Sequence, residues 1–331
     1  MRRLTGSTLA LGLIASLAIA TVAGCNASRP SDSSLVRLGH FPNVTHAQAL
    51  VAHAMSREGR GWFEARLGPG IRIEWFVYNA GPSAMEAFFA GSLDATYVGP
   101  SPALNAHLKS GGNEVRILAG SAQGGSALLV PANSPLRVPA DFRGKTISTP
   151  QLGNTQDVSC RSWLAANGFR VTQMGGDVNV LPAANPDMLL LFRDGKLDAA
   201  WTVEPWVSIL ERDLGARVFL EEDHIVTTVL ASSAALLRER PLIAKALAAA
   251  HEELTRWLLD NPEEAQRIVA AELEKETGRK VSPEIIASAW KRLTFTTDIA
   301  LEPLQEFVDA AETAGFVRDA PGLERLLEPP R

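Results

Sequence analysis

Hydrophobic and polar positions follow two different periods between residues 35 and 205 of the chain. Short runs rich in β-branched and aromatic residues alternate with longer segments in which apolar positions recur every three or four residues. The first pattern predicts strands and the second predicts helices. Their regular alternation indicates βαβ units. The expected strands are 35–39, 71–77, 95–98, 116–119, 126–130, 146–149, 178–181 and 199–203, and the expected helices are 47–64, 82–90, 102–109, 155–167 and 186–192.

The two halves of this region share a phrase, at 89–100 and again at 192–205. In each copy a glycine is expected to end a helix in the left-handed conformation, and a leucine and an aspartate then lead into a buried strand. A proline follows the strand and can open the next helix. The topology therefore restarts, which predicts two similar α/β lobes, 35–130 and 131–222. Residues 223–331 are expected to return to the first lobe and add amphipathic C-terminal helices, whose dense charge would form a solvated face.

The N-terminus has the pattern of a secreted lipoprotein. Residues 1–3 are basic, residues 9–22 are apolar or small, and the sequence Val-Ala-Gly-Cys follows, ending at Cys25. This pattern is typical of a signal peptide with a lipobox, and the apolar run is shorter than the about 20 residues of a membrane-spanning helix. We therefore expect removal of residues 1–24, lipidation of Cys25 and a flexible tether over 25–34. The protein would then be anchored in the cell envelope, on the periplasmic or extracellular face of a membrane.

Composition adds limits to this picture. With 331 residues and 46% hydrophobic residues, the chain is long enough for two lobes with a sizeable core. Its formal net charge of −5 gives no indication of nucleic acid as a partner. If Cys25 carries a lipid, Cys160 has no disulfide partner, and we expect it to be a buried packing residue.

Polar and glycine-rich turns follow the predicted strands, where open parallel sheets bind their ligands. Most of these turns also open a helix, whose free N–H groups and dipole favour an anion. Any one such turn is an ordinary helix cap, but several at matching positions in two lobes predict a binding cleft. The candidate ligand-binding residues are Phe41, Asn43, Thr45, His46, Gly81, Pro82, Gly99, Pro100, Ser101, Ser121, Gln123, Gly124, Gln151, Asn154, Thr155, Gln156, Trp201 and Glu204.

Several of these residues leave alternatives open. An ionised Glu204 would oppose a simple anion and favour a taurine-like zwitterion or a cationic heterocycle, whereas Trp201 could equally be core. His46 could contact the ligand or satisfy a local carbonyl, and His40 and His53 are expected to be packed. A metal site would need more closely grouped ligands, so no metal ion is expected.

The phrases at 39–43, 88–94, 97–100, 143–147, 150–155 and 203–206 resemble the nitrate, sulfonate and taurine family of ABC-transporter solute-binding proteins, which share a fold with thiamine-precursor receptors. The resemblance implies a type II periplasmic-binding-protein fold, with two α/β lobes, mixed and mostly parallel sheets, and a hinge. It implies a monomer that holds a small oxyanion between its lobes, an aliphatic sulfonate first and taurine or nitrate next, and delivers it to an ABC permease and its ATPase. It requires no cofactor and no catalytic residue.

Three other functions remain as alternatives. One is a receptor for a thiamine-precursor-like heterocycle, and another is a sensor or adhesion lipoprotein that has lost its transporter. The third is an enzyme on the same fold, as in pyrimidine synthesis or the menaquinone pathway. Those enzymes work in the cytosol or need clustered cysteine and histidine, and the chain has no nucleophile elbow, phosphate-binding loop or dinucleotide fingerprint.

Overall fold

The computed structural model describes residues 32–172, 176–317 and 322–327. The expected signal peptide, Cys25 and the tether up to residue 31 lie outside the described residues. The unit from Ser33 onward contains two sheets and the helices that cover them. None of its described helices combines the length and the apolar character needed to cross a membrane.

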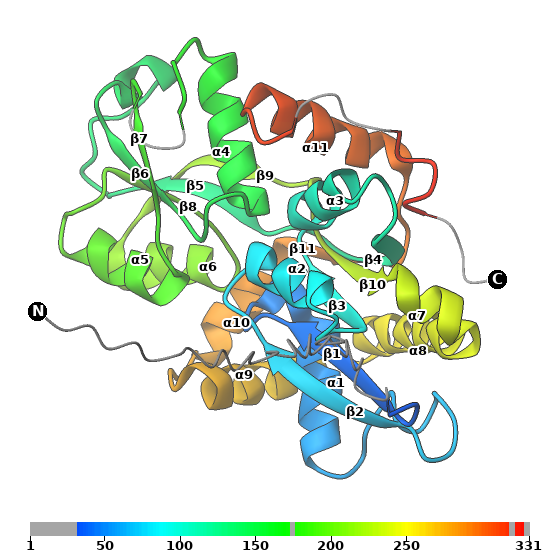
Figure 1. Ribbon diagram of the computed structural model, residues 1–331. Coiled ribbons are helices and arrows are strands. Elements are labelled where there is room, and N and C mark those ends of the chain that lie inside the picture. The colour runs from blue at the N-terminus through cyan, green and yellow to red at the C-terminus, as the bar shows by residue number, and fades with distance from the viewer. Residues whose placement is uncertain (1–31, 173–175, 318–321, 328–331) are drawn as a thin grey trace, which may run out of the picture. The chain divides into compact units, whose positions relative to one another are not determined.

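The first sheet combines strands from the beginning and the end of the chain. Its order is β11-β4-β10-β3-β1-β2 (Figure 1). β1 pairs in parallel with β2 and β3, whereas β10 pairs antiparallel with β3 and β4, and β11 pairs antiparallel with β4. The strands are β1 (Leu35–His40), β2 (Arg72–Val77), β3 (Ala95–Val98), β4 (Val115–Gly124), β10 (Val226–Ser233) and β11 (Leu293–Phe295).

The second sheet is formed by the middle of the chain, in the order β7-β6-β8-β5-β9. β6 is parallel to β7 and β8, and β5 is antiparallel to β8 and β9. The expected fold of two α/β lobes with mixed sheets is confirmed. Parallel pairs do not predominate, because β10 and β11 in the first sheet and β5 in the second run antiparallel to their neighbours. The strands are β5 (Ser126–Val130), β6 (Thr146–Thr149), β7 (Asn179–Pro182), β8 (Ala199–Val203) and β9 (Arg217–Glu222).

The chain passes between the sheets earlier than the sequence prediction placed it. β4 belongs to the first sheet and β5 to the second, so the first crossing lies at Gly124 and Gly125 and not after residue 130. Both glycines have positive φ, of 73° and 70°, a conformation that other residues rarely adopt. The chain can therefore turn here, in a space where a side chain would not fit. The turn signals at Pro131 mark the end of β5 and not a lobe boundary. The chain returns to the first sheet between β9 and β10.

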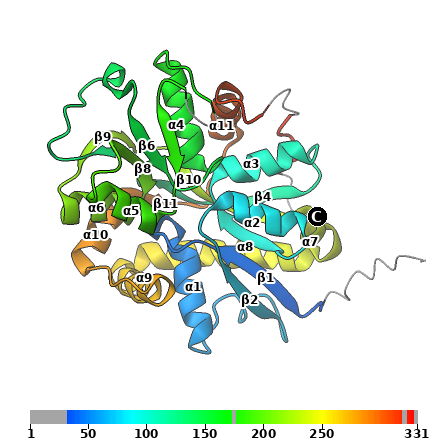
Figure 2. The ribbon, with the colours of Figure 1, turned by 60° about the vertical axis from the view of Figure 1, so that its left-hand side comes forward.

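Helices cover both sheets. α11 packs against α3 of the first lobe and α4 of the second, as Figure 2 shows. α1 ends at Arg57 and not at residue 64, because Gly59 takes a φ of 72°. The helices are α1 (Ala47–Arg57), α2 (Gly81–Phe89), α3 (Pro100–Lys109), α4 (Thr155–Ala166), α5 (Asn185–Arg193), α6 (Trp206–Leu214), α7 (Ala234–Glu239), α8 (Pro241–Asp260), α9 (Pro262–Thr277), α10 (Pro283–Lys291) and α11 (Leu301–Thr313), with 3-10 turns at Val44–His46 and Pro139–Phe142.

The repeated phrase forms the same structure in both lobes, once between α2 and β3 and once between α5 and β8. Asp94 accepts a hydrogen bond from the backbone amide of Arg37 at 2.8 Å, and Asp198 accepts one from that of Thr146 at 2.9 Å. Each aspartate thus fastens the start of its strand to the neighbouring parallel strand. The glycine of each phrase has positive φ and the leucine is buried, as expected: Gly91, Gly195, Leu93 and Leu197.

Cys160 lies in the core of the second lobe and is fully buried. Burial raises the pKa of its thiol well above the usual value, and the nearby Asp157 carboxylate adds to this effect. The expectation that Cys160 is a packing residue is therefore confirmed.

The crossing at Gly124 predicts a specific sensitivity to substitution. A Cβ atom there would lie 2.5 Å from the carbonyl oxygen of Arg292 and 2.7 Å from that of Asp223, whereas one at Gly195 would meet nothing within 4 Å. Both positions have positive φ, so Gly195→Ala should cost about 1 kcal/mol of unfolding free energy from backbone strain alone. Gly124→Ala should cost about 3 kcal/mol, because overpacking is added to strain. Urea unfolding of both variants measures the difference, and equal losses would contradict the tight crossing.

Candidate ligand-binding site

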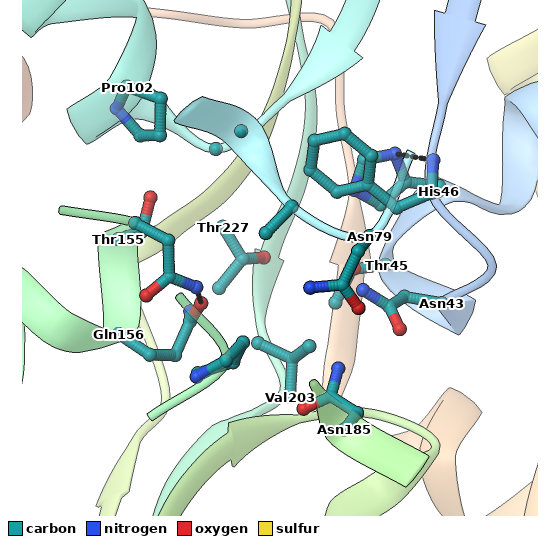
Figure 3. Close-up of a pocket in the computed structure, with 16 residues that line it drawn as sticks. Asn43, Thr45, His46, Asn79, Pro102, Thr155, Gln156, Asn185, Val203 and Thr227 are labelled. Carbon is teal, nitrogen blue, oxygen red and sulfur yellow. Dashed lines mark hydrogen bonds between the residues drawn. The ribbon is translucent and has the colours of Figure 1, made fainter. Parts of the chain in front are cut away.

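A small cavity lies between the two lobes, with a volume of about 20 Å³ open to the centres of water-sized molecules. It is bounded on one side by the ends of first-sheet strands and on the other by turns of the second lobe (Figure 3). The first lobe supplies Phe41, Asn43, Thr45, His46, Asn79, Ala80, Gly81, Gly99, Pro102 and Thr227, and the second lobe supplies Pro150, Asn154, Thr155, Gln156, Asn185 and Val203.

Four helices begin at the wall of this cavity. Gly81 and Asn185 are the first residues of α2 and α5, Gly99 directly precedes α3, and Thr155 opens α4. The first N–H groups of a helix have no intrahelical acceptor, and the helix dipole places partial positive charge there. Prolines in the first turns of α2, α3 and α5 remove some of these N–H groups, so the remaining amides and the dipoles act together. The cavity therefore has a positive potential that comes from the backbone.

No described residue that lines the cavity carries a carboxylate, an ammonium or a guanidinium group. His46 is the one lining side chain whose ordinary pKa lies near neutral pH. Its Nδ1 accepts a hydrogen bond from the backbone amide of Phe41 at 3.4 Å. Burial lowers the pKa of His46 well below its usual 6.5, and the neighbouring His40 lowers it further. The ring is thus neutral, with its proton on Nε2 as a donor.

Protein donors fix the orientation of two lining amides. The indole N–H of Trp206 donates to Asn43 Oδ1 at 3.0 Å, and since an indole only donates, the amide nitrogen of Asn43 points elsewhere. The backbone amide of Asp157 donates a hydrogen bond to Asn154 Oδ1 at 2.9 Å. Asn154 Nδ2 in turn donates to Gln156 Oε1 at 3.0 Å. The amide nitrogens of Asn43 and Gln156 are therefore left as donors.

The second lobe adds an amide and a hydroxyl. The Thr202 hydroxyl donates to Asn185 Oδ1 at 2.8 Å, which leaves the amide nitrogen of Asn185 as another donor. Thr155 Oγ1 is buried, and within the described residues no hydrogen bond reaches it. A Cβ atom at Gly99 would lie 2.3 Å from this hydroxyl, so only glycine allows the two lobes to approach here. Figure 3 shows Thr155 and Gln156 opposite Asn43 across the cavity.

Part of the wall is apolar. Phe41, Pro102, Pro150 and Val203 line it, and the Phe41 ring lies 4.5 Å from that of His46 between centroids. The cavity thus combines a donor-rich region with a surface that suits a short carbon chain.

Contacts between the lobes surround the cavity. Gln151 Nε2 of the second lobe donates to Ser83 Oγ of the first at 3.1 Å. The backbone amide of Val44 donates to the carbonyl oxygen of Glu204 at 3.0 Å. Together with the bond between Trp206 and Asn43, these contacts hold the lobes against each other, so a ligand in the cavity would touch both.

The structure brings part of the candidate set to the cavity: Phe41, Asn43, Thr45, His46, Gly81, Gly99, Asn154, Thr155 and Gln156. Gln151 lies beside it in a contact between lobes. Pro82 lines a neighbouring surface pocket, and Pro100 and Ser101 are buried in the first turn of α3. Ser121 donates to Gln48 Oε1 at 2.9 Å, and Gln123 and Gly124 pair with β11. Ser121, Gln123 and Gly124 do not line the cavity, because β4 does not end at it but continues to the crossing between the two sheets.

Trp201 and Glu204 also lie outside the lining. Trp201 is 1% exposed and its indole donates to Glu222, which places it in the core of the second lobe. Glu204 is fully buried, and its carboxylate accepts hydrogen bonds from the Ser208 hydroxyl at 2.9 Å and from Arg292 Nη1 at 3.1 Å. Burial raises the pKa of Glu204 to about 7, while Ser208 and Arg292 oppose the rise. Its carboxylate is thus held by the protein and does not face the cavity.

Three polar lining residues, Asn79, Asn185 and Thr227, were not in the candidate set predicted from the sequence. Asn79 lies in the turn between β2 and α2, two residues before the selected Gly81. Asn185 follows the strand β7 in an Asn-Pro turn, a signal of the same kind as the turns that were selected. Thr227 lies in β10, a strand that the hydrophobic pattern did not reveal. Of the lining residues, only Thr227 belongs to the strand that returns from the second lobe, so local sequence alone does not connect it with the others.

The model of the NMT1-like family matches residues 29–273 of the chain. A Brucella abortus protein whose name describes a binding protein without stating a ligand is 26% identical over 231 residues, which cover 68% of each chain. The taurine-binding periplasmic protein of Escherichia coli is 26% identical over 144 residues, 44% of this chain and 43% of the relative.

Solved structures show the same fold. The alkanesulfonate-binding protein of Xanthomonas axonopodis pv. citri, bound to MOPS, has a TM-score of 0.71 at 21% identity, covering 89% of this chain and 96% of the other. The nitrate-binding protein of Synechocystis PCC 6803 has a TM-score of 0.69 at 16% identity, covering 87% and 83%. The resemblance to the nitrate, sulfonate and taurine binding proteins is therefore confirmed.

The buried His46 predicts a loss of stability in acid. Below pH 6.5 His46 is protonated in the unfolded chain but stays unprotonated in the native protein. The unfolding free energy therefore falls as the pH falls, by at most about 1.4 kcal/mol per pH unit from this group. His46→Gln removes the group and should make the decline between pH 6.5 and pH 5 shallower by about 1 kcal/mol per unit. Urea unfolding at several pH values measures both slopes, and parallel curves would contradict a neutral buried His46.

Proposed function

The chain belongs to the NMT1-like family, and we propose that it is the solute-binding protein of an ABC importer that captures a small oxyanion, an aliphatic sulfonate first, between its two lobes. The relatives named for alkanesulfonate, taurine and nitrate support this proposal, as does the shared fold. The orientation of the lining amides is the observation on which it rests most.

A ligand for this cavity must accept many hydrogen bonds. The amide oxygens of Asn43, Gln156 and Asn185 are occupied by protein donors, so their nitrogens remain to be satisfied. The Thr155 hydroxyl and the starts of four helices add further donors. A sulfonate group presents three acceptor oxygens and a negative charge, which suits donors and helix dipoles together.

The same lining favours a sulfonate over the other candidates. Taurine carries an ammonium group, and the described lining offers it no carboxylate, because Glu204 is held by Ser208 and Arg292. Nitrate has no carbon chain to cover the apolar wall around Phe41 and Val203. A short alkanesulfonate satisfies both regions of the cavity. Taurine, nitrate and a thiamine-precursor pyrimidine are the competing ligands for a binding screen.

The mechanism of capture follows from the two-lobed geometry. A ligand that contacts Thr155 of one lobe and Asn43 of the other binds the closed form better than the open form, and so shifts the population toward closure. A permease that recognises the closed form would then receive only the loaded protein. Lipidation of Cys25 would keep the monomeric receptor on the membrane that holds the permease and its ATPase. The family match begins at residue 29, shortly after Cys25, which is where a tethered domain would begin.

Binding accounts for the lining better than catalysis does. The side chains around the cavity include no cysteine or acidic group among the described residues, and Cys160 is sealed in the core of the second lobe. A sensor without a transporter would use the same cavity, and an adjacent permease gene would distinguish the importer from it.

Thr155→Val tests the donor role of the buried hydroxyl. Valine has nearly the same shape but cannot donate, so the dissociation constant for ethanesulfonate should rise about tenfold or more, the effect of losing one hydrogen bond to a charged group. Isothermal titration calorimetry measures it. Thr294→Val, at an exposed position of β11 outside the lining, is the matched control and should leave binding unchanged. Equal affinities of the two variants would remove Thr155 from the site.

Cys25→Ala tests the membrane anchor. Without the thiol no diacylglycerol can be attached, so palmitate labelling should be lost and the protein should leave the membrane fraction. Cys160→Ala removes the other cysteine and should retain both labelling and membrane association. Continued labelling of Cys25→Ala would contradict the lipobox assignment.

A further inference from the structure

His40, His53 and Glu276 form a buried cluster away from the ligand cavity. His40 is the last residue of β1, His53 lies in α1, and Glu276 lies in the last turn of α9. Their side chains are 0%, 8% and 1% exposed. The C-terminal region thus brings a carboxylate to two histidines from the beginning of the fold.

The three facing atoms form a nearly equilateral triangle. His40 Nε2 lies 2.9 Å from His53 Nδ1 and 3.2 Å from Glu276 Oε1, and His53 Nδ1 lies 3.0 Å from Glu276 Oε1. Ligand atoms about 2.0–2.1 Å from a tetrahedral zinc ion are separated by about 3.3 Å. The triangle therefore has nearly the dimensions of one face of a zinc coordination tetrahedron.

The hydrogen-bond pattern presents lone pairs to the centre of the cluster. His40 Nδ1 lies 3.3 Å from the carbonyl oxygen of Phe41, and since a carbonyl only accepts, Nδ1 carries the proton. In the tautomer with its proton on Nδ1 alone, Nε2 offers a lone pair, as in metal-binding histidines with a carbonyl partner. A proton on His53 Nδ1 can hold the triangle by a hydrogen bond to His40 Nε2 or to Glu276 Oε1, and a metal ion in place of that proton would use all three lone pairs.

The surroundings also suit a cation. Glu276 Oε2 is buried, and among the described residues no hydrogen bond reaches it. Oε1 of the fully buried Glu272 lies 3.7 Å from His53 Nδ1, although its charge is partly met by Arg57 at 2.7 Å and Lys275 at 3.5 Å. Two carboxylates therefore flank the two imidazoles, and Arg57 Nη2 lies 4.0 Å from Glu276 Oε1.

The neighbouring aromatic ring restricts the ligand geometry. Trp75 of β2 stacks on His53 with ring centroids 4.9 Å apart and an angle of 13° between the planes, which limits rotation of the imidazole. Oriented ligands reduce the entropy lost on metal binding.

We propose that His40, His53 and Glu276 bind one zinc ion that fastens α9 to β1 and α1. Two imidazoles and a carboxylate are a ligand set that zinc prefers, and they leave a fourth coordination position. The ion has a structural role, because the cluster is enclosed and separate from the ligand cavity. The inference does not depend on the proposed transport function.

The test uses the full-length protein in mild detergent, without a polyhistidine tag and stripped of metal by a chelator. Calorimetric titration with zinc should show one equivalent bound, and the midpoint of thermal unfolding should rise by several degrees. Cobalt(II) should produce the visible absorption bands of a four-coordinate nitrogen and oxygen site. A folded protein that takes up neither metal would overturn the proposal and leave a proton-sharing cluster.

Matched variants locate the site. Glu276→Gln and His53→Gln keep the size of each side chain nearly unchanged and should weaken zinc binding at least tenfold. Glu274→Gln changes an exposed carboxylate of the same helix and should bind zinc like the wild type. Circular dichroism confirms that each variant is folded. Zinc affinity that is the same in Glu276→Gln and the wild type would place the metal elsewhere and refute the assignment.

Discussion

Four helices begin at the wall of one small cavity, and the amide groups that the prolines of their first turns leave free must be satisfied by whatever fills it. This requirement explains the residues at the helix starts: Gly81 and Gly99 leave space for close approach, and Thr155 and Asn185 add polar groups. The described lining has no acidic or basic side chain besides His46, and burial keeps His46 neutral. The attraction for an anion therefore comes from oriented dipoles. Such an arrangement is formed in advance by the fold and needs little rearrangement on binding.

Contacts behind the lining maintain this orientation. Trp206 holds Asn43, and the first turn of α4 holds Asn154 and, through it, Gln156. The bond between Trp206 and Asn43 also joins the lobes, so the donor orientation and the closed arrangement depend on the same contact. The buried Glu204 belongs to this supporting structure, where Arg292 of the C-terminal region meets the second lobe.

The sequence predicted the parts of the fold and site that are encoded locally. The repeated phrase at Asp94 and Asp198 indicated two lobes, and the turns that open helices contained most of the polar lining. Features that depend on distant partners were missed. The Glu204 carboxylate is held by Arg292, 88 positions away, together with the nearby Ser208. The cluster around His53 needs Glu276, 223 positions away, on a helix whose charge was expected to be solvated.

The affinity of the wild-type protein for ethanesulfonate, compared with an uncharged sulfone of the same size and with ethylammonium, tests the anion cavity most directly. Calorimetric titration of all three under the same conditions is the measurement. The sulfonate should bind at least about a hundredfold more tightly than the sulfone, since charge strengthens each of several hydrogen bonds, and the ammonium compound should not bind. Equal binding of sulfonate and sulfone, or preference for the cation, would contradict the account.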